Sequence, residues 1–293
     1  MQVAQQSIVV GIDGTAPALA AARWAAALAA GRGAPLILVS VIAVPDTRIV
    51  APRWADADLR DLLRAEGRRA VRQAAAVVQA DRPGVEPTQL VLDGDPAAEL
   101  LVAAESARLL VVAAGGASPL RTLLLGSTAL RVADKALCPV AVWRGDPDAP
   151  LPGRGPVLAG VDGSPCGDIA LEHAFDLASL LGTDLVALHA WNDPDLLRWS
   201  AAPEDERALA ERETELLGER LAGWPEKYPD VAVTRVVRKS PAASALLAEA
   251  ETASLVVAGT HGRNRLVRTM IGSTSQNLLH HAPCPVVLCR LPA

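Results

Sequence analysis

The sequence predicts an α/β protein made of two repeated domains, each a doubly wound sheet of five parallel strands with helices on both faces. Three observations lead to this fold class. Short apolar runs rich in Val, Ile and Leu alternate with longer helical patterns. The apolar runs are nearly unbroken, as expected for parallel strands that are buried on both faces. The same motifs then return in the second half of the chain, in the same order.

The repeat is carried by short motifs at separations of about 145 to 149 residues. The small drift in separation indicates short insertions or deletions between two parallel halves. The matching pairs are Gly11–Thr15 with Gly160–Ser164, Asp95–Ala98 with Ser240–Ala243, Gly126–Thr128 with Gly272–Thr274, and Cys138–Val140 with Cys284–Val286. The chain therefore reads as a tandem duplication, with one domain over residues 1–146 and the other over 154–293. The stretch 145–155 is rich in Pro, Gly and Asp and suits an exposed linker.

Composition sets the class of protein. A chain of 293 residues is comfortable for two domains, and 51% of the residues are hydrophobic. One Tyr, one Phe and six Trp leave the cores to Ala, Val and Leu. A net charge of -5 gives no sign of nucleic-acid binding. There is no signal-peptide pattern and no apolar run of membrane-spanning length, so we expect a soluble, cytoplasmic protein without membrane contact.

The first half alternates strands and helices in chain order. Thr15 is expected to cap the first helix, with Pro17 in its first turn. Asp95 followed by Pro96 is expected to start a later helix in the same way. The expected strands are 8–12, 35–42, 88–92, 109–113 and 140–143, and the expected helices are 15–30, 56–79, one from Asp95, and 127–135.

The second half repeats this order. Its helices are expected to be capped by Ser164-Pro165 and Ser240-Pro241, and the last to begin near Ser273. The expected strands are 157–161, 185–189, 231–237, 255–258 and 286–289, with a further helix over 204–221. Ligands of such sheets sit beyond the carboxyl ends of the strands, where both Asp-Gly turns are placed.

Four cysteines, Cys138, Cys166, Cys284 and Cys289, include no CxxC pair. We interpret them as buried structural thiols, because free Cys behaves as a small hydrophobe and a reducing compartment disfavours disulfides.

The most informative stretch runs from Gly259 to Ser275. Gly259-Thr260-His261-Gly262 follows an apolar strand, and Gly272-Ser273-Thr274-Ser275 opens a helix nine residues later. Glycines let the backbone approach a phosphate, and a helix start offers free N–H groups and a positive dipole end. We interpret the stretch as the phosphate cradle of a nucleotide site.

This glycine element resembles that of the universal stress protein family in its tandem-domain form. The resemblance rests on the element together with a first strand that ends in Asp-Gly-Thr or Asp-Gly-Ser, and it covers both halves. It implies an ATP site in which the glycine element takes the ribose and phosphates. The Asp after the first strand and the backbone at the end of the second strand would take the adenosine part.

Carried onto this sequence, the resemblance implies a complete set of binding residues in the second half. These are Val161, Asp162, Gly163, Ala190, Ala258, Gly259, Gly262, Arg263, Gly272, Ser273, Thr274 and Ser275. The corresponding set in the first half is Ile12, Asp13, Gly14, Val41, Val112, Ala113, Gly116, Gly126, Ser127 and Thr128. This half departs from the pattern, because Ala113 replaces the first glycine and Ala129 replaces the hydroxyl of Ser275. We therefore predict tighter ATP binding in the second half.

Each of these residues also has a plainer interpretation. Asp13 and Asp162 are common turn residues, and Gly262 and Gly272 would also serve chain reversal. His261 would either donate to a phosphate or stay on the surface, and Arg263, Arg265 and Arg268 would either pair with phosphates or face solvent. His280 and His281 lack a third metal ligand at useful spacing. The Asp turn and the glycine element recur at the same relative place in both halves, and this recurrence favours the interpretation as a nucleotide site.

The expected function is an adenine-nucleotide-binding stress regulator or nucleotide sensor, with ATP carrying Mg²⁺ on its phosphates. AMP or another adenylate stays open. No GxxxxGK[ST], GxGxxG after a first strand, or GxSxG motif is present, so any hydrolysis would be slow. The alternatives are a weak ATPase and an interaction module that binds no nucleotide. We also expect the final strands to pair the two halves within one chain, a homodimer, and a protein partner that the sequence does not name.

Overall fold

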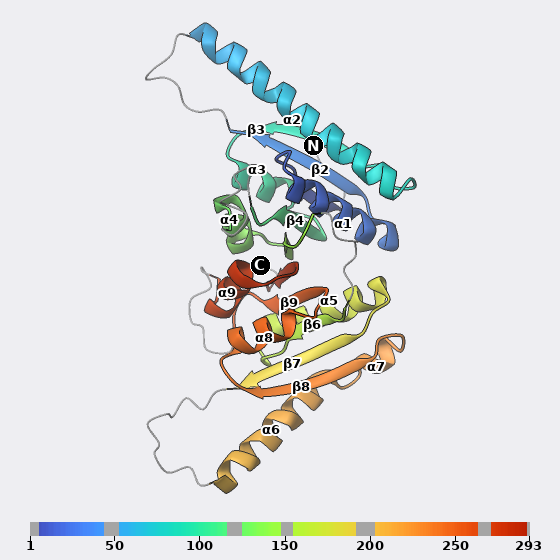
Figure 1. The fold of residues 1–293 in the computed structure, drawn as a ribbon, viewed down its shortest axis with the longest axis vertical. Coiled ribbons are helices and arrows are strands. Elements are labelled where there is room, and N and C mark those ends of the chain that lie inside the picture. Colours follow the sequence, from blue (N-terminus) through green and yellow to red (C-terminus); the bar gives the residue numbers. More distant parts are fainter. Residues whose placement is uncertain are drawn as a thin grey trace. The chain divides into compact units, whose positions relative to one another are not determined.

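The computed structural model describes residues 6–43, 53–115, 125–147, 155–191, 203–262 and 271–291, with the side chains of 53–57 and 203–206 left aside. The chain divides into two compact units (Figure 1), the first ending at Pro152 and the second spanning Gly153–Leu291. This division falls inside the Pro- and Gly-rich stretch 145–155.

The first unit is a five-stranded sheet in the order β3-β2-β1-β4-β5, and all neighbouring strands are parallel. The order reverses beside β1, which is the arrangement of a doubly wound sheet with its switch point between β1 and β4. The strands are β1 (Ile8–Gly11), β2 (Leu36–Ile42), β3 (Thr88–Asp93), β4 (Leu109–Ala113) and β5 (Val140–Trp143).

Helices cover both faces of this sheet, as the unbroken apolar strands require. The helices are α1 (Ala16–Arg32), α2 (Arg53–Asp81), α3 (Pro96–Ala103) and α4 (Ser127–Lys135). α1 packs against α2, and α3 packs against α4, so that each pair forms one covering layer. The predicted fold class is confirmed.

The second unit repeats the first, in the strand order β8-β7-β6-β9-β10 and again with parallel neighbours. α5 packs on β6 and β9, α6 on β7 and β8, and α8 against α9. The strands are β6 (Val157–Gly160), β7 (Leu185–Trp191), β8 (Val233–Lys239), β9 (Leu255–Gly259) and β10 (Val286–Cys289). The helices are α5 (Pro165–Leu181), α6 (Pro203–Leu221), α7 (Trp224–Lys227), α8 (Ala242–Ala250) and α9 (Ser273–His281).

Three of the four predicted helix caps are confirmed. The Thr15 side chain accepts from the Ala18 N–H, Ser164 accepts from Gly167, and Asp95 accepts from Ala98, each followed by Pro in the first turn. The predicted cap at Ser240 is wrong. α8 begins one residue later than the matching helix α3, so Pro241 takes the cap position, where it has no side-chain donor or acceptor.

Both cores are built mainly from small aliphatic residues, as the composition predicts. Trp24 and Phe175 are the largest fully buried side chains. Phe175 stacks on Trp224 of the short helix α7 and on Tyr228, at centroid distances of 5.1 and 5.6 Å. This aromatic cluster holds α7 against α5.

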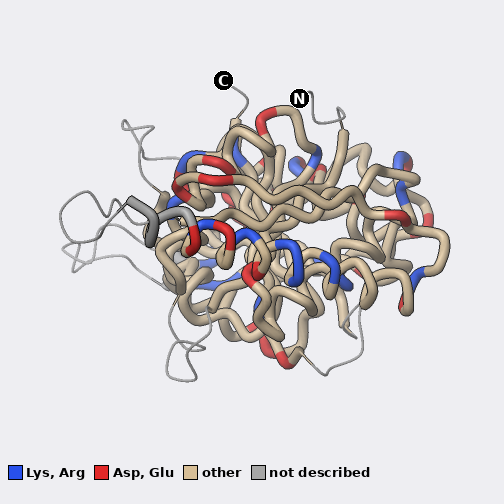
Figure 2. Tube along the Cα trace, turned by 90° about the horizontal axis from the view of Figure 1, so that it is seen from above, with Lys and Arg blue, Asp and Glu red and all other residues tan. Residues whose placement is uncertain are grey.

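Acidic and basic residues are interspersed along the trace (Figure 2). Several form ion pairs at the helix starts and strand ends, among them Arg131–Asp95 at 2.7 Å and Arg64–Asp93. The hydrogen bonds from Arg131 and from the Ala98 N–H hold the pKa of the exposed Asp95 carboxyl below its ordinary value. Within the described parts of the chain, no helix combines the length and apolarity needed to cross a membrane.

Candidate functional site

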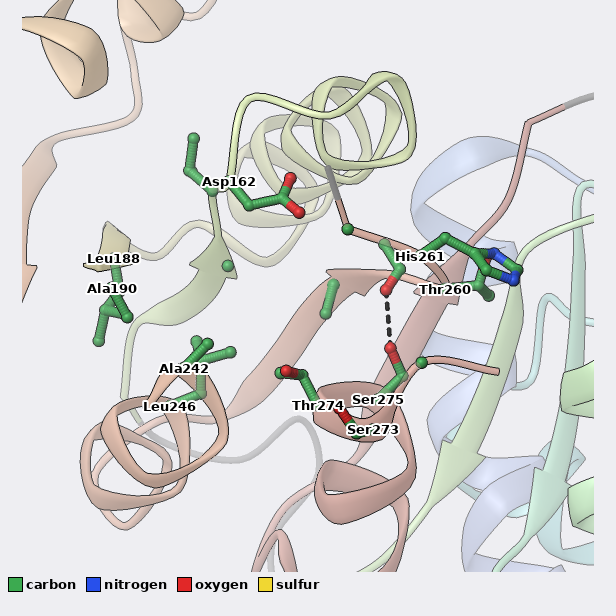
Figure 3. Close-up of a pocket in the computed structure, with 16 residues that line it drawn as sticks. Asp162, Leu188, Ala190, Ala242, Leu246, Thr260, His261, Ser273, Thr274 and Ser275 are labelled. Atoms are coloured by element: carbon green, nitrogen blue, oxygen red, sulfur yellow. Dashed lines mark hydrogen bonds between the residues drawn. The ribbon is translucent and has the colours of Figure 1, made fainter. Parts of the chain in front are cut away.

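A cavity of about 370 Å³ lies at the carboxyl ends of β6, β7 and β9 in the second unit (Figure 3). Parallel strands place their following loops at one edge of the sheet, which is why residues 160 and 259 meet there. The cavity is lined by Gly160, Val161, Asp162, Leu188, Ala190, Ala242, Leu246, Ala258, Gly259, Thr260, His261, Gly262, Gly272, Ser273, Thr274 and Ser275.

The turn after β6 presents the carboxylate of Asp162 to this cavity. Its Oδ1 atom accepts from the N–H and the hydroxyl of Ser164, at 2.9 and 2.6 Å. Oδ2 lies beside Gly262, where an added Cβ would come within 2.9 Å of it. One oxygen therefore fixes the side chain, and the other is directed at the glycine loop.

The glycine loop is folded so that its carbonyl oxygens are engaged by protein donors. The Gly259 carbonyl accepts from the Ser275 hydroxyl at 2.8 Å, and the Thr260 carbonyl accepts from the Gly272 N–H at 2.8 Å. The loop also packs closely on α5, because a Cβ at Gly259 would lie 2.9 Å from backbone and side-chain atoms of Cys166. Engaged carbonyls reduce the repulsion that an anion would meet at this loop.

The start of α9 supplies the donors of the cavity. Gly272 is the N-cap, and the first turn, Ser273-Thr274-Ser275, contains no acidic residue. The first N–H groups of a helix have no acceptor within the helix, and the dipole is positive at this end. A helix start without an acidic side chain keeps that charge available to an anionic ligand.

Most of the predicted residues of the second half line the cavity. Gly163 lies outside its wall, in a left-handed turn with φ 72° beside the Arg220 guanidinium. Arg263, Arg265 and Arg268 lie outside the described residues. The His261 imidazole points away from Asp162 in Figure 3, and its Nδ1 atom lies 3.0 Å from the Thr260 hydroxyl.

Sequence reasoning missed several wall residues, Gly160, Leu188, Ala242, Leu246 and Thr260. Two signals would have found some of them. Leu188 lies two residues before Ala190 and so shares its face of β7, and Ala242 and Leu246 share one face of α8 at a spacing of four. Their side chains give the cavity an apolar wall opposite the polar cradle.

The first unit has a smaller cavity at the matching place. It measures about 190 Å³ and is lined by the predicted residues Ile12, Asp13, Val41, Val112, Ala113 and Thr128, together with Gly11, Ala18, Val39, Pro96, Leu100 and Ala129. Gly126 is the N-cap of α4, and Ser127 is its first residue. Gly14 instead lines a separate groove with α2, and Gly116 lies outside the described residues.

One further difference separates the two cavities. Gly167 opens the space beside Asp162, since a Cβ there would come within 2.4 Å of Oδ1. The first half has Ala18 at this position, and its Asp13 is exposed, whereas Asp162 is half-buried. The methyl groups of Ala18, Ala113 and Ala129 are consistent with the smaller cavity.

All four cysteines are buried and none of them is in a disulfide, as predicted. Burial raises the pKa of the Cys138 thiol to about 11 and raises the pKa of the Cys289 thiol as well. The thiols of Cys138 and Cys289 are therefore poor nucleophiles in the folded chain.

The comparisons with known proteins decide the family. The model of the universal stress protein family matches residues 5–144 and again residues 153–290. The chain belongs to the universal stress protein family. A universal stress protein of Mycolicibacterium smegmatis is 39% identical over 294 residues, covering 98% of this chain and 97% of that protein. One from Mycobacterium tuberculosis is 38% identical over 299 residues, with coverages of 98% and 97%.

A solved structure supports the fold of this universal stress protein. The crystal structure of a universal stress protein from Archaeoglobus fulgidus matches with a TM-score of 0.71 at 19% identity. The match covers 97% of this chain and 98% of the Archaeoglobus fulgidus chain. These likenesses cover both halves of this chain.

Proposed function

We propose that the second half binds an adenine nucleotide, ATP with Mg²⁺ on its phosphates, and that the protein acts as a stress-linked regulator or nucleotide sensor. The observation that carries this proposal is the cavity that joins Asp162 to the glycine loop and to the start of α9. Its two sides have different chemistry, and a nucleotide has the same division between base and phosphates.

The apolar side suits a purine base. Leu188, Ala190 and Leu246 offer aliphatic contacts, and a volume of about 370 Å³ is in the range of small-ligand sites. The Asp162 carboxylate is a strong acceptor for sugar hydroxyls because it is charged. The bonds of its Oδ1 atom with Ser164 hold the side chain in place and leave Oδ2 for the ligand. The base and ribose would then lie between β7 and Asp162.

The polar side suits the phosphates. The first-turn N–H groups of α9 and the hydroxyls of Ser273 and Thr274 are donors, and their positive helix end favours an anion. Mg²⁺ typically keeps several waters and binds through substrate phosphates, so it would be carried into this side of the cavity by the phosphates of ATP. When bound, Mg²⁺ would neutralise part of the phosphate charge.

The phosphate-binding elements, the glycine loop and the start of α9, suggest how a bound nucleotide would regulate a partner. Bound phosphates would order the glycine loop and the start of α9, and this would change a surface that a partner reads. Hydrogen exchange tests this idea directly. Amides within residues 259–275 should exchange more slowly after ATP is added, and unchanged exchange there would count against the mechanism.

The two halves should differ in affinity. A Cβ at Gly272 would lie 3.0 Å from the Thr260 carbonyl oxygen, whereas a Cβ at the matching Gly126 would lie 3.6 Å from the Ala114 carbonyl oxygen. We expect Gly272→Ala to weaken ATP binding by about tenfold, because the helix start must shift relative to the phosphates. The matched variant Gly126→Ala should leave the tighter site unchanged. Calorimetric titration measures both, and equal losses from the two variants would refute the asymmetry.

A weak ATPase is distinguished from a binding protein by its dependence on this cavity. Phosphate release that survives both Asp162→Ala and Gly272→Ala would identify a contaminant. Purified protein that retains no nucleotide, measured by absorbance and mass, would instead favour an interaction module without a ligand.

A further inference from the structure

We propose that His189 and Glu213 form a positioning clamp that holds the base-binding edge of the second-half cavity from behind. This inference rests on the proposed nucleotide site and adds to it two residues that do not touch the ligand. His189 lies in β7, between the cavity residues Leu188 and Ala190. Because side chains alternate along a strand, its imidazole projects to the opposite face of the sheet, where α6 packs.

Both ring nitrogens of His189 are engaged, although the side chain is fully buried. Nδ1 lies 2.6 Å from the carbonyl oxygen of Val161, and Nε2 lies 2.7 Å from Oε2 of Glu213. The Glu213 side chain is 23% exposed, so the pair is closed off from most of the solvent. These contacts join three elements, namely the end of β6, the end of β7 and the middle of α6.

The partners of the two ring nitrogens of His189 determine where the hydrogens lie. A carbonyl oxygen only accepts, so Nδ1 must carry the hydrogen that bonds Val161. Nε2 then shares a second hydrogen with Glu213, which comes either from an imidazolium ring or from a carboxylic acid. In either form, removing Glu213 leaves Nε2 of the buried imidazole without its hydrogen-bond partner, and removing His189 leaves the Val161 carbonyl without its donor. Losses of this kind are costly in a buried site.

The clamp acts on the residues that would hold adenosine. Val161 and Ala190 both line the cavity, and the Val161 N–H also donates to the Leu188 carbonyl at 2.8 Å. The His189 bond to the Val161 carbonyl is therefore a second link between the same two strand ends. It fixes the spacing between the Asp162 turn and the wall formed by Leu188 and Ala190.

The first unit provides a natural comparison, because the matching residue there is Ser40. A serine hydroxyl is too short to reach from β2 to the helix above it. A groove of about 450 Å³ lies at this place, and its wall includes Ser40, Val41, Leu63, Gly67 and Ala70. The first unit therefore lacks the histidine, and its glycine element also departs from the pattern, with Ala113 in place of a glycine.

The test uses the full chain and two ligands, adenosine and ATP, titrated by calorimetry. His189→Ser, which copies the first half, and Glu213→Leu should each raise the Kd for both ligands by about tenfold, and by the same factor for each ligand. Gly272→Ala should raise the Kd for ATP only. His189→Asn keeps a donor near the Nδ1 position and should recover part of the adenosine affinity. Ser40→Ala is the matched control and should change neither Kd.

The outcomes separate this inference from the proposed function. A wild-type chain that binds neither ligand overturns the proposed function and the clamp with it. Wild-type binding with an unchanged Kd in His189→Ser overturns the clamp alone. A loss that lowers the fraction of binding-competent protein but leaves Kd unchanged would show that the pair serves only stability, and this would also overturn it.

Discussion

Replacing Gly262 by Val should nearly abolish nucleotide binding while leaving the protein folded. A Cβ at this position would lie 2.9 Å from Oδ2 of Asp162, and Oδ2 is the oxygen that is directed into the cavity. Asp162 cannot rotate freely out of the way, because its Oδ1 atom is bonded to the N–H and hydroxyl of Ser164. The valine would therefore displace the carboxylate or occupy the place of the sugar.

The expected increase in Kd for Gly262→Val follows from the loss of the hydrogen bond between the nucleotide and the Asp162 carboxylate. A hydrogen bond to a charged group contributes about 1.5–3 kcal/mol, which corresponds to a Kd about 10 to 100 times higher. Gly262 does not lie in the left-handed region, so a valine does not require an unfavourable φ there. The midpoint of thermal unfolding should change little, because the clash falls on a single side-chain oxygen. Gly116→Val is the matched control in the first half, and similar losses from both variants would contradict the assignment of the tighter site.

Replacing Phe175 by Ala should give the largest loss of stability. Phe175 is 0% exposed and stacks on Trp224 with an interplanar angle of 10° and on Tyr228 with an angle of 25°. Truncating a buried Phe costs about 3–5 kcal/mol, and the lost ring stacking is part of that loss. The effect should be confined to the unfolding transition of the second unit, because the cluster lies within it.

Urea unfolding followed by fluorescence measures this loss. Leu137→Ala is the control, since Leu137 is 54% exposed and its truncation should change stability by less than about 0.5 kcal/mol. Phe175→Leu keeps an apolar side chain in place and serves if the alanine variant does not fold. A loss below about 1 kcal/mol from Phe175→Ala would contradict the role of the cluster in holding α7.

Local signals account for the part of the fold that was predicted from sequence. Thr15, Asp95 and Ser164 cap their helices because each places a side-chain oxygen near N–H groups two or three residues ahead. α4 and β10 have the predicted bounds. β8 begins two residues later than predicted, at Val233, because the apolar residues Val231 and Ala232 precede the first pairing with β7, at Leu185 and Val233. α7 was missed, although Gly223 before Trp224-Pro225 is a helix-start signal.

The residues of the candidate site also fall into those that local sequence signals predict and those that only the folded structure brings together. Asp162 and the glycine loop were predicted because each motif stands within a few residues of a strand end. Ala242 and Leu246 are apolar residues of a distant helix, and only the packing of α8 brings them to the cavity. His189 and Glu213 are separated by 24 residues on different elements, and no spacing rule links a strand histidine to a helix carboxylate. Such contacts depend on tertiary structure.

Native mass spectrometry of the purified chain tests the central claim most directly, because it reports bound nucleotide and the number of chains together. The wild-type protein should carry an adenine nucleotide, the Gly116→Val variant should retain it, and the Gly262→Val variant should lose it. A wild-type chain that carries none after incubation with ATP and Mg²⁺, or a Gly262→Val variant that retains it fully, would contradict binding at Asp162 and the glycine loop.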